Sequence, residues 1–239
     1  ISMPVTKWNY QVTKAEEIPM AIAKAFYIAR SGKPGPVLVD ITKDAQFEML
    51  DYQYKPFEGM RSYSPKYSLD LDQVKKAAEL INSAKKPFVL FGQGVVLSNA
   101  EKEFKEFIEK SGIPSAWTIM GLSALDSDHY LNVGMLGMHG NYAPNKMTNE
   151  CDLLIAVGMR FDDRVTGDLS RYAKQAKVIH LEIDPAEVDK NVKTDIAVLG
   201  DAKESLVALT ELVNKKEHSN WLNEFRKLEQ EEINTVINK

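Results

Sequence analysis

Short apolar segments alternate with amphipathic segments through most of this 239-residue chain. After residue 68, apolar runs predict strands at about 87–91, 114–118, 152–157, 177–183 and 196–199. Apolar residues at helical spacing predict helices at about 70–84, 99–111 and 201–214. Nearly continuous apolar strands are typical of parallel sheets that are buried on both faces. We therefore expect an α/β fold, a doubly wound parallel sheet with helices on both faces.

The first third of the chain has a different pattern. A capping-box string, Thr13-Lys14-Ala15-Glu16, precedes one amphipathic helix that contains Pro19, and an apolar strand is predicted at 36–41. Residues 46–68 have no periodicity and are rich in Tyr, Pro and Ser, which is typical of a linker. We expect the end of a separate α/β domain at 1–45, a linker at 46–68 and the main domain at 69–215.

An amphipathic, charged segment at 216–239 predicts a helical tail or the start of another linker. The chain starts at Ile1 rather than Met, and its first segment is one helix and one strand without the rest of a sheet. These features predict a fragment of a longer polypeptide.

Composition excludes several classes of protein. The net charge is −4 and the isoelectric point about 5.7, without a basic stripe, so we expect no nucleic-acid partner. Apolar runs of about six residues are too short to span a membrane. Cys151 is the one cysteine, which excludes an internal disulfide and fits a reducing, cytoplasmic location. We expect it to be a small buried side chain rather than a reactive thiol.

The segment Gly158-Met-Arg-Phe-Asp-Asp-Arg-Val-Thr-Gly167 directly follows a buried strand. In open α/β sheets ligands bind at the carboxyl ends of strands. Arg160 and Arg164 would suit a phosphate or carboxylate there, because guanidinium groups form bidentate, charge-assisted hydrogen bonds. The alternative is a surface cluster of ion pairs with Asp162 and Asp163.

Other predicted strands end in similar segments, which are Gly92-Gln93-Gly94, Thr118-Ile119-Met120-Gly121, Leu136-Gly137-Met138-His139-Gly140, Glu182-Ile183-Asp184 and Gly200-Asp201-Ala202. Each has a structural alternative: a tight turn without ligand for the glycines, a structural histidine for His139, and a helix N-cap for Asp201. Together, close amides, arginines and carboxylates at one sheet edge favour a dinucleotide such as FAD. No nucleophile–base pair or metal-ligand spacing is evident.

At these residues the chain resembles the large catalytic subunits of acetohydroxyacid synthases (acetolactate synthases), which are thiamine diphosphate-dependent enzymes. The matching strings are Met3-Pro-Val-Thr-Lys7, Lys33-Pro-Gly-Pro-Val-Leu-Val-Asp-Ile41, Met135-Leu-Gly-Met-His-Gly140, Arg160-Phe-Asp-Asp-Arg-Val-Thr-Gly167, His180-Leu-Glu-Ile-Asp-Pro185 and Gly200-Asp201. The resemblance implies that 1–45 ends the thiamine-pyrimidine-binding domain and that 69–215 is the central FAD-binding domain. The catalytic thiamine site would lie outside this segment, leaving the fragment inactive and without a metal site.

The resemblance also implies site residues. FAD contacts would be Gly92, Gly94, Thr118, Ile119, Met120, Leu136, Gly137, His139, Gly158, Met159, Arg160, Asp162, Arg164, Val165, Glu182, Ile183, Asp201 and Ala202. The substrate channel would be lined by Lys66, Met138, Asp163 and Arg164. Two departures from the family pattern are Gln93, where a glycine is usual, and Tyr63, where some members have an arginine.

The parent enzyme implied by this resemblance condenses pyruvate with pyruvate or 2-oxobutyrate after thiamine diphosphate-dependent decarboxylation. The reaction belongs to valine, leucine and isoleucine biosynthesis. Its cofactors would be thiamine diphosphate, Mg²⁺ and a structural FAD, and its partners a second copy in a homodimer or tetramer and a small regulatory subunit. Pyruvate oxidase, glyoxylate carboligase and a non-catalytic nucleotide-binding domain are the alternatives.

Overall fold

The computed structural model describes residues 1–238. Its internal contacts divide the chain into two units, Ile1–Tyr67 and the residues from Ser68 onward. The division falls between the predicted linker and the predicted main domain. Each unit is described by itself below.

The first unit contains two parallel strands, β1 (Trp8–Val12) and β2 (Val37–Ile41), and the helices α1 (Ile18–Arg30) and α2 (Lys43–Phe47). Its small core includes Val12, Ala21 and Ala45. The strand β1 was not expected from the sequence, because Trp8–Val12 mixes polar and apolar residues without clear alternation.

The predicted capping box is wrong. Residues Ala15–Glu17 form a 3₁₀ turn, and it is Glu17 rather than Glu16 whose carboxylate accepts from the backbone N–H of Thr13, at 3.2 Å. The helix α1 begins only at Ile18, with Pro19 in its first turn. Proline is tolerated there because the N–H that it lacks would have no helical acceptor.

The carboxyl end of α1 is capped by an ammonium group. Lys7 Nζ donates to the carbonyls of Ile28, Ser31 and Lys33 at 2.7, 2.6 and 2.9 Å. A cation placed there donates to carbonyls that have no donor partner at the end of the helix, and it complements the negative end of the helix dipole.

The second unit is a doubly wound α/β sheet, as predicted, and all of its strand pairs are parallel. The strand order is β5-β4-β3-β6-β7-β8. The strands are β3 (Pro87–Phe91), β4 (Ser115–Trp117), β5 (Asn132–Met135), β6 (Leu153–Val157), β7 (Lys177–Glu182) and β8 (Ile196–Leu199). The sequence did not predict β5, a short edge strand with polar and glycine residues.

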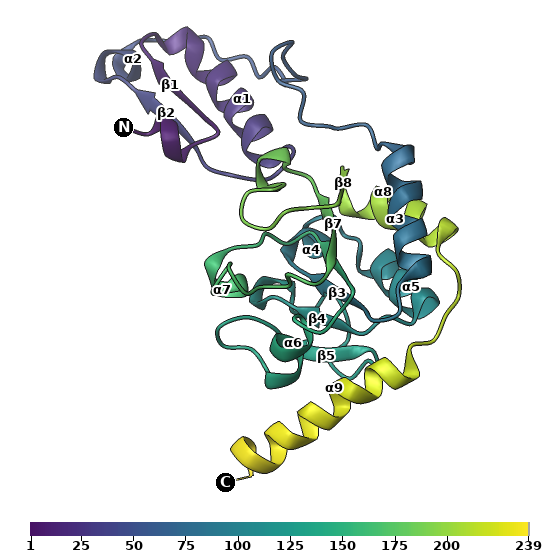
Figure 1. Ribbon diagram of the computed structural model, residues 1–239. Coiled ribbons are helices and arrows are strands. Elements are labelled where there is room, and N and C mark those ends of the chain that lie inside the picture. Colours follow the sequence, from purple (N-terminus) through teal and green to yellow (C-terminus); the bar gives the residue numbers. More distant parts are fainter. Residues whose placement is uncertain (239) are drawn as a thin grey trace. The chain divides into compact units, whose positions relative to one another are not determined.

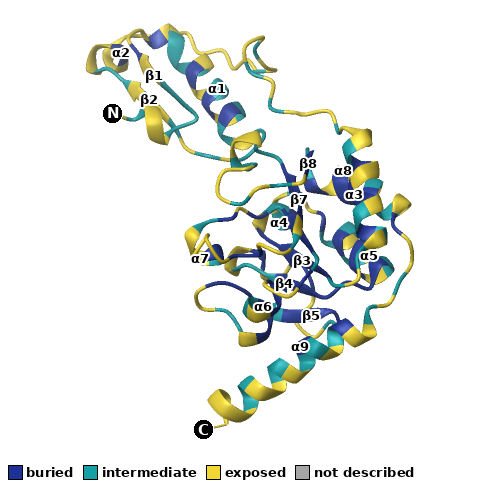
Figure 2. Ribbon diagram, in the orientation of Figure 1, coloured by how far each residue is buried: buried dark blue, intermediate teal, exposed yellow. Residues whose placement is uncertain are grey.

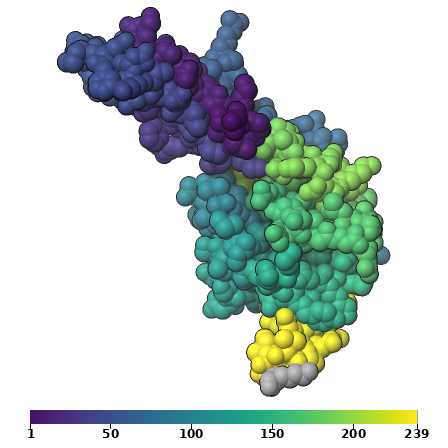
Figure 3. Space-filling view, turned by 90° about the vertical axis from the view of Figure 1, so that its left-hand side faces the viewer, coloured from purple at the N-terminus to yellow at the C-terminus, as the bar shows by residue number. Residues whose placement is uncertain are grey.

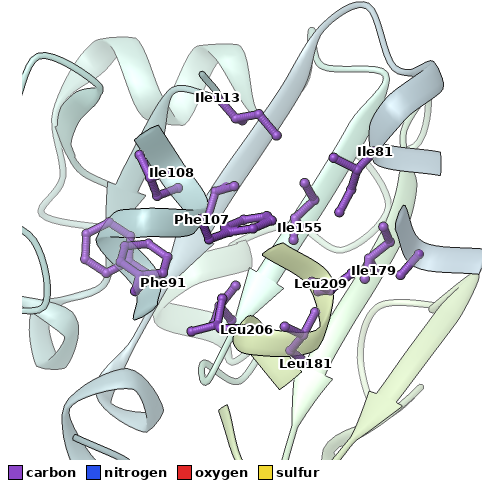
Figure 4. Packing of buried hydrophobic residues seen from close by; sticks show 14 of the residues in the cluster. Ile81, Phe91, Phe107, Ile108, Ile113, Ile155, Ile179, Leu181, Leu206 and Leu209 are labelled. Carbon is purple, nitrogen blue, oxygen red and sulfur yellow. The ribbon is translucent and has the colours of Figure 1, made fainter. Parts of the chain in front are cut away.

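Alternate residues of the central strands face two separate cores. Val89 and Phe91 face the core covered by α3 (Leu71–Ser83), α5 (Glu101–Ser111) and α8 (Ala202–Leu212). Phe88 and Leu90 face the opposite core. This alternation follows from the two-residue period of a strand, and Figure 2 shows the central strands buried throughout. Figure 4 shows Phe91, Phe107, Ile155 and Leu206 interdigitating in the first core.

The opposite face of the sheet is covered by α6 (Tyr142–Met147) and α9 (Ser219–Glu232). Trp221 and Phe225 of α9 are buried in that core, and Trp221 Nε1 donates to the carbonyl of Pro87 at 2.8 Å. The segment expected as a tail or linker therefore forms a helix whose first turns pack on the sheet (Figure 1). Figure 3 shows its surface, in yellow, adjoining teal residues from the middle of the chain.

Within residues 1–238, no helix combines the length and hydrophobicity that crossing a membrane requires.

Candidate functional site

The strand order reverses between β3 and β6, which lie side by side at the middle of the sheet. From β3 the chain runs to β4 and β5 on one side, and then returns to β6, β7 and β8 on the other. Such a switch point leaves a crevice outside the carboxyl ends of the two strands, where open α/β sheets bind ligands. The segments Gly92–Gly94 and Gly158–Arg160 follow these two strands.

The two glycine turns contact each other directly. Gly92 N donates to the carbonyl of Val157 at 3.0 Å, and Gly94 N donates to the carbonyl of Gly158 at 2.8 Å. A Cβ at Gly94 would lie 2.5 Å from Gly158 Cα, and Gly158 has a φ of +56°. Both glycines are therefore required by the approach of backbone to backbone, so their presence needs no ligand to explain it.

The turn after β4 packs against the same edge. Thr118 N donates to the carbonyl of Phe91 at 2.9 Å, and a Cβ at Gly121 would lie 2.6 Å from that oxygen. Residues Ile119–Gly121 form a 3₁₀ turn that leaves the Ile119 and Met120 side chains exposed. Three of the predicted segments thus meet at the carboxyl ends of β3, β4 and β6.

The loop Leu136–Gly140 lies against α7 (Asp163–Thr166), the short helix of the arginine segment. Met138 N donates to the carbonyl of Arg164 at 2.8 Å, and Arg164 Nη1 lies 3.6 Å from Met138 Sδ. A Cβ at Gly137 would lie 2.7 Å from the same carbonyl oxygen. His139 is exposed and makes no side-chain hydrogen bond to the described chain, so it is not a buried structural histidine.

Asn145 holds the backbone of the loop at Leu136–Gly140, and the sequence did not predict this role. Its Oδ1 accepts from Gly137 N at 2.8 Å, and its Nδ2 donates to the carbonyl of Gly137 at 2.9 Å. This pair of bonds fixes a glycine whose φ is +102°. No sequence signal marks Asn145, because the pairing spans eight residues of irregular loop and helix.

In the arginine segment, one ion pair forms and the guanidinium groups remain accessible. Arg160 Nε lies 3.0 Å from Asp162 Oδ2, with 63% of the Arg160 side chain exposed. Asp162 also caps α7 by accepting from Arg164 N at 3.2 Å. An exposed pair of this kind contributes little stability. It is one of the ion pairs expected in the structural alternative, while Asp163 and Arg164 are exposed.

Backbone donors add to the arginines. Within residues 1–238, the amide N–H groups of Met159, Arg160, Phe161 and Asp162 donate to no other residue. Consecutive amides without acceptors, next to two arginines, form a donor set suited to an anion such as a diphosphate. The residues at this crevice therefore fit the diphosphate part of a dinucleotide.

The carboxylates at the carboxyl ends of β7 and β8 accept hydrogen bonds from nearby backbone amides. Glu182 Oε1 accepts from Ile183 N and Asp184 N at 3.0 and 3.2 Å. Asp201 is the N-cap of α8 and accepts from Lys203 N at 2.9 Å. This capping role is the structural alternative weighed for Asp201, and the hydroxyl-binding role of both carboxylates stays a prediction.

The remaining predicted positions differ in burial and in the unit to which they belong. Val165 is half-buried in α7, Ile183 is half-buried after β7, and Ala202 is buried at the start of α8. Lys66 belongs to the first unit, so it is not placed relative to the crevice. Among the described residues, no group of three or more His, Cys, Asp and Glu side chains could hold a metal ion.

The chain belongs to the thiamine pyrophosphate enzyme family, whose central-domain model matches residues 74–209. Its sequence is similar to large subunits of acetolactate synthase. It is 45% identical to the large subunit from Corynebacterium glutamicum over 88% of this chain and 34% of that protein. It is 39% identical to the isozyme 3 large subunit from Escherichia coli over 95% of this chain and 40% of that protein.

A solved structure supports the fold. The benzoylformate decarboxylase from Polynucleobacter necessarius aligns with a TM-score of 0.75 and 23% identity, over 92% of this chain and 41% of that one. The chain spans about two fifths of the length of the relatives it matches. The predicted fold class is confirmed, and so is the predicted membership of the thiamine diphosphate-dependent enzymes.

Proposed function

We propose that this chain forms the FAD-binding central part of an acetolactate synthase large subunit. The observation that carries the proposal is the set of donors at the carboxyl ends of β3 and β6. There, the exposed Arg160 and Arg164 adjoin a run of backbone amides without acceptors. The similarity to acetolactate synthase large subunits supports the same assignment.

In this proposal the arginine segment holds the diphosphate of FAD. The turn at Thr118–Gly121 and the loop at Leu136–Gly140 contribute backbone and apolar contacts to the rest of the cofactor. Glu182 and Asp201 bind hydroxyl groups of the cofactor through their carboxylates. FAD serves as a structural group, with no redox step in the reaction. Met138, Asp163 and Arg164, together with Lys66, line the path of the substrate.

We infer that the chemistry belongs to a longer protein of which this chain is part. That protein condenses pyruvate with pyruvate or 2-oxobutyrate, using thiamine diphosphate and Mg²⁺ held by residues outside this segment. It would work in the cytoplasm as a homodimer or tetramer, with a small regulatory subunit as a further partner. The segment alone would be inactive.

Titration of the chain with FAD, followed by flavin fluorescence, tests the cofactor assignment. We expect saturable binding that Arg160→Ala weakens by about ten- to a hundredfold, since one charge-assisted contact is worth roughly 1.5–3 kcal/mol. Arg171→Ala is the matched control, because it removes the same charge from an exposed arginine outside the turns of the crevice. No saturable binding by a folded sample, or equal weakening by both variants, would count against the FAD assignment.

The products made by the longer protein test the reaction. Formation of acetolactate from pyruvate supports an acetolactate synthase. Peroxide from pyruvate would indicate a pyruvate oxidase, and tartronate semialdehyde from glyoxylate a glyoxylate carboligase.

A further inference from the structure

A histidine that is buried in the sheet contacts the backbone of the arginine segment, residues 158–167. His180 is in β7 with no exposed surface, and its neighbours across the sheet are Ala156 of β6 and Ala197 of β8. These small neighbours leave room for an imidazole. Burial of an imidazole is costly unless its polar atoms form hydrogen bonds, so the partner of this ring indicates what it does.

The partner is the backbone of the arginine segment. His180 Nε2 lies 2.8 Å from the carbonyl oxygen of Met159. A carbonyl can only accept, so Nε2 carries the proton and donates it. Glu182 Oε2 lies 3.7 Å from the same nitrogen. Met159 lies between Gly158, which has a positive φ, and Arg160.

The same ring also contacts the residue on the other side of Arg160. The rings of His180 and Phe161 pack edge to face, with centroids 5.2 Å apart and an interplanar angle of 65°. Asn191 Nδ2 donates to the carbonyl of Phe161 at 2.6 Å. The backbone is therefore held before and after Arg160, while the Arg160 side chain itself stays 63% exposed.

We propose that His180 is a positioning residue for the anion-binding segment. Its hydrogen bond to Met159 fixes the backbone from Gly158 to Phe161, so that the free amides and the Arg160 guanidinium face a bound diphosphate without first being ordered. Binding is then stronger, because less conformational entropy of the segment is lost when the ligand binds. The proposal rests on the proposed FAD site for its ligand, but the ordering of the segment is a property of the chain alone.

Two substitutions separate the hydrogen bond from the packing. His180→Gln keeps an N–H donor near the position of Nε2, and His180→Leu keeps an apolar side chain without a donor. In FAD titrations we expect His180→Leu to weaken binding about tenfold and His180→Gln to stay within about threefold of the original chain. In an Arg160→Ala background, His180→Leu should weaken binding less than about twofold, because residues that act as one unit have non-additive effects.

Hydrogen exchange without FAD provides an independent readout. In His180→Leu, exchange should rise at the amides of Gly158 and Val165, which flank the segment and donate to the carbonyls of Leu181 and Asp162. Peptides from α3 and α5 should stay protected, and His180→Gln should resemble the original chain. Unchanged exchange at the Gly158 and Val165 amides in a folded His180→Leu variant would overturn the proposal. So would equal loss of affinity in the Leu and Gln variants, or an undiminished effect in the Arg160→Ala background. If the original chain binds no FAD, the cofactor proposal fails, and the exchange experiment still decides the role of His180.

Discussion

Replacement of Gly94 by alanine tests whether the crevice depends on direct contact between two backbone turns. The added Cβ would lie 2.5 Å from Gly158 Cα and 2.9 Å from the carbonyl oxygen of Gly158, whereas ordinary contacts of a Cβ lie at 3.4–4 Å. The neighbours are backbone atoms, so no side-chain rotation relieves the overlap. The turns after β3 and β6 must separate by about 1 Å, at a cost typical of overpacking.

The size of the effect follows from three contributions. Overpacking costs about 1–3 kcal/mol, and loss of the 2.8 Å hydrogen bond from Gly94 N to the carbonyl of Gly158 costs about 1 kcal/mol more. Alanine instead of glycine in α4 (Gln93–Leu97) offsets up to about 1 kcal/mol, because glycine is the poorer helix former. The expected net loss in free energy of unfolding is about 2–3 kcal/mol.

Calorimetry or near-ultraviolet circular dichroism measures this loss. A domain of 150–250 residues shifts its Tm by about 2–4 °C for each kcal/mol, so the second unit should melt about 4–12 °C lower. FAD affinity should fall as well, since the turn carries part of the crevice.

The control variant is Gly35→Ala, whose Cβ would meet only the flexible side chain of Lys7, at 3.0 and 3.1 Å. It adds the same methyl group to the first unit, where Lys7 can move only by giving up part of its contacts to the carbonyls of Ile28, Ser31 and Lys33. The melting temperature of the second unit should therefore stay unchanged. An unchanged or raised Tm for Gly94→Ala would refute the reasoning, since it would mean that the turns separate without cost.

Three further predictions concern other parts of the chain. Burial raises the pKa of the Cys151 thiol to about 12, so a thiol reagent at pH 8 should label it only as the protein unfolds; labelling at the rate of a free thiol in the native state would contradict this. Burial, followed by the charge of Lys216, lowers the pKa of His218 in the folded chain. Below pH 6.5 the unfolded chain then binds more protons than the folded chain, so the free energy of unfolding should decrease as the pH is lowered. In denaturant titrations between pH 7 and 5, His218→Gln should show a smaller decrease. Lys7→Met removes the three carbonyl contacts at the end of α1 and should destabilise the first unit by about 2 kcal/mol, seen as faster amide exchange at 27–33 with unchanged exchange in the second unit.

Much of the sheet could be predicted because its strands and helices carry strong local patterns. The run Leu153–Val157 is apolar at every position, and Pro87–Phe91 is likewise fully buried. The helix at Leu71–Ser83 has its apolar residues on one face. Such segments reveal their structure because every residue contributes to the same periodicity.

Elements of weak pattern escaped prediction. The edge strand Asn132–Met135 contains a polar residue and a glycine, and it is a strand because β4 offers it hydrogen-bonding partners. The same holds for Trp8–Val12, which pairs with β2 along its full length. The late start of α1 also depends on a contact that the capping-box pattern did not contain, the bond from Thr13 N to Glu17.

The sequence by itself determined the fold class, the family and the segments that end each strand, because glycines, arginines and carboxylates recur there in a readable order. Only the tertiary structure decided which segments meet. The strand order brings the turn at 92–94 into contact with Gly158. It also brings His180 within hydrogen-bonding distance of the Met159 carbonyl. These contacts join residues far apart in the chain, and their energies depend on distances of a few ångströms that no local pattern encodes.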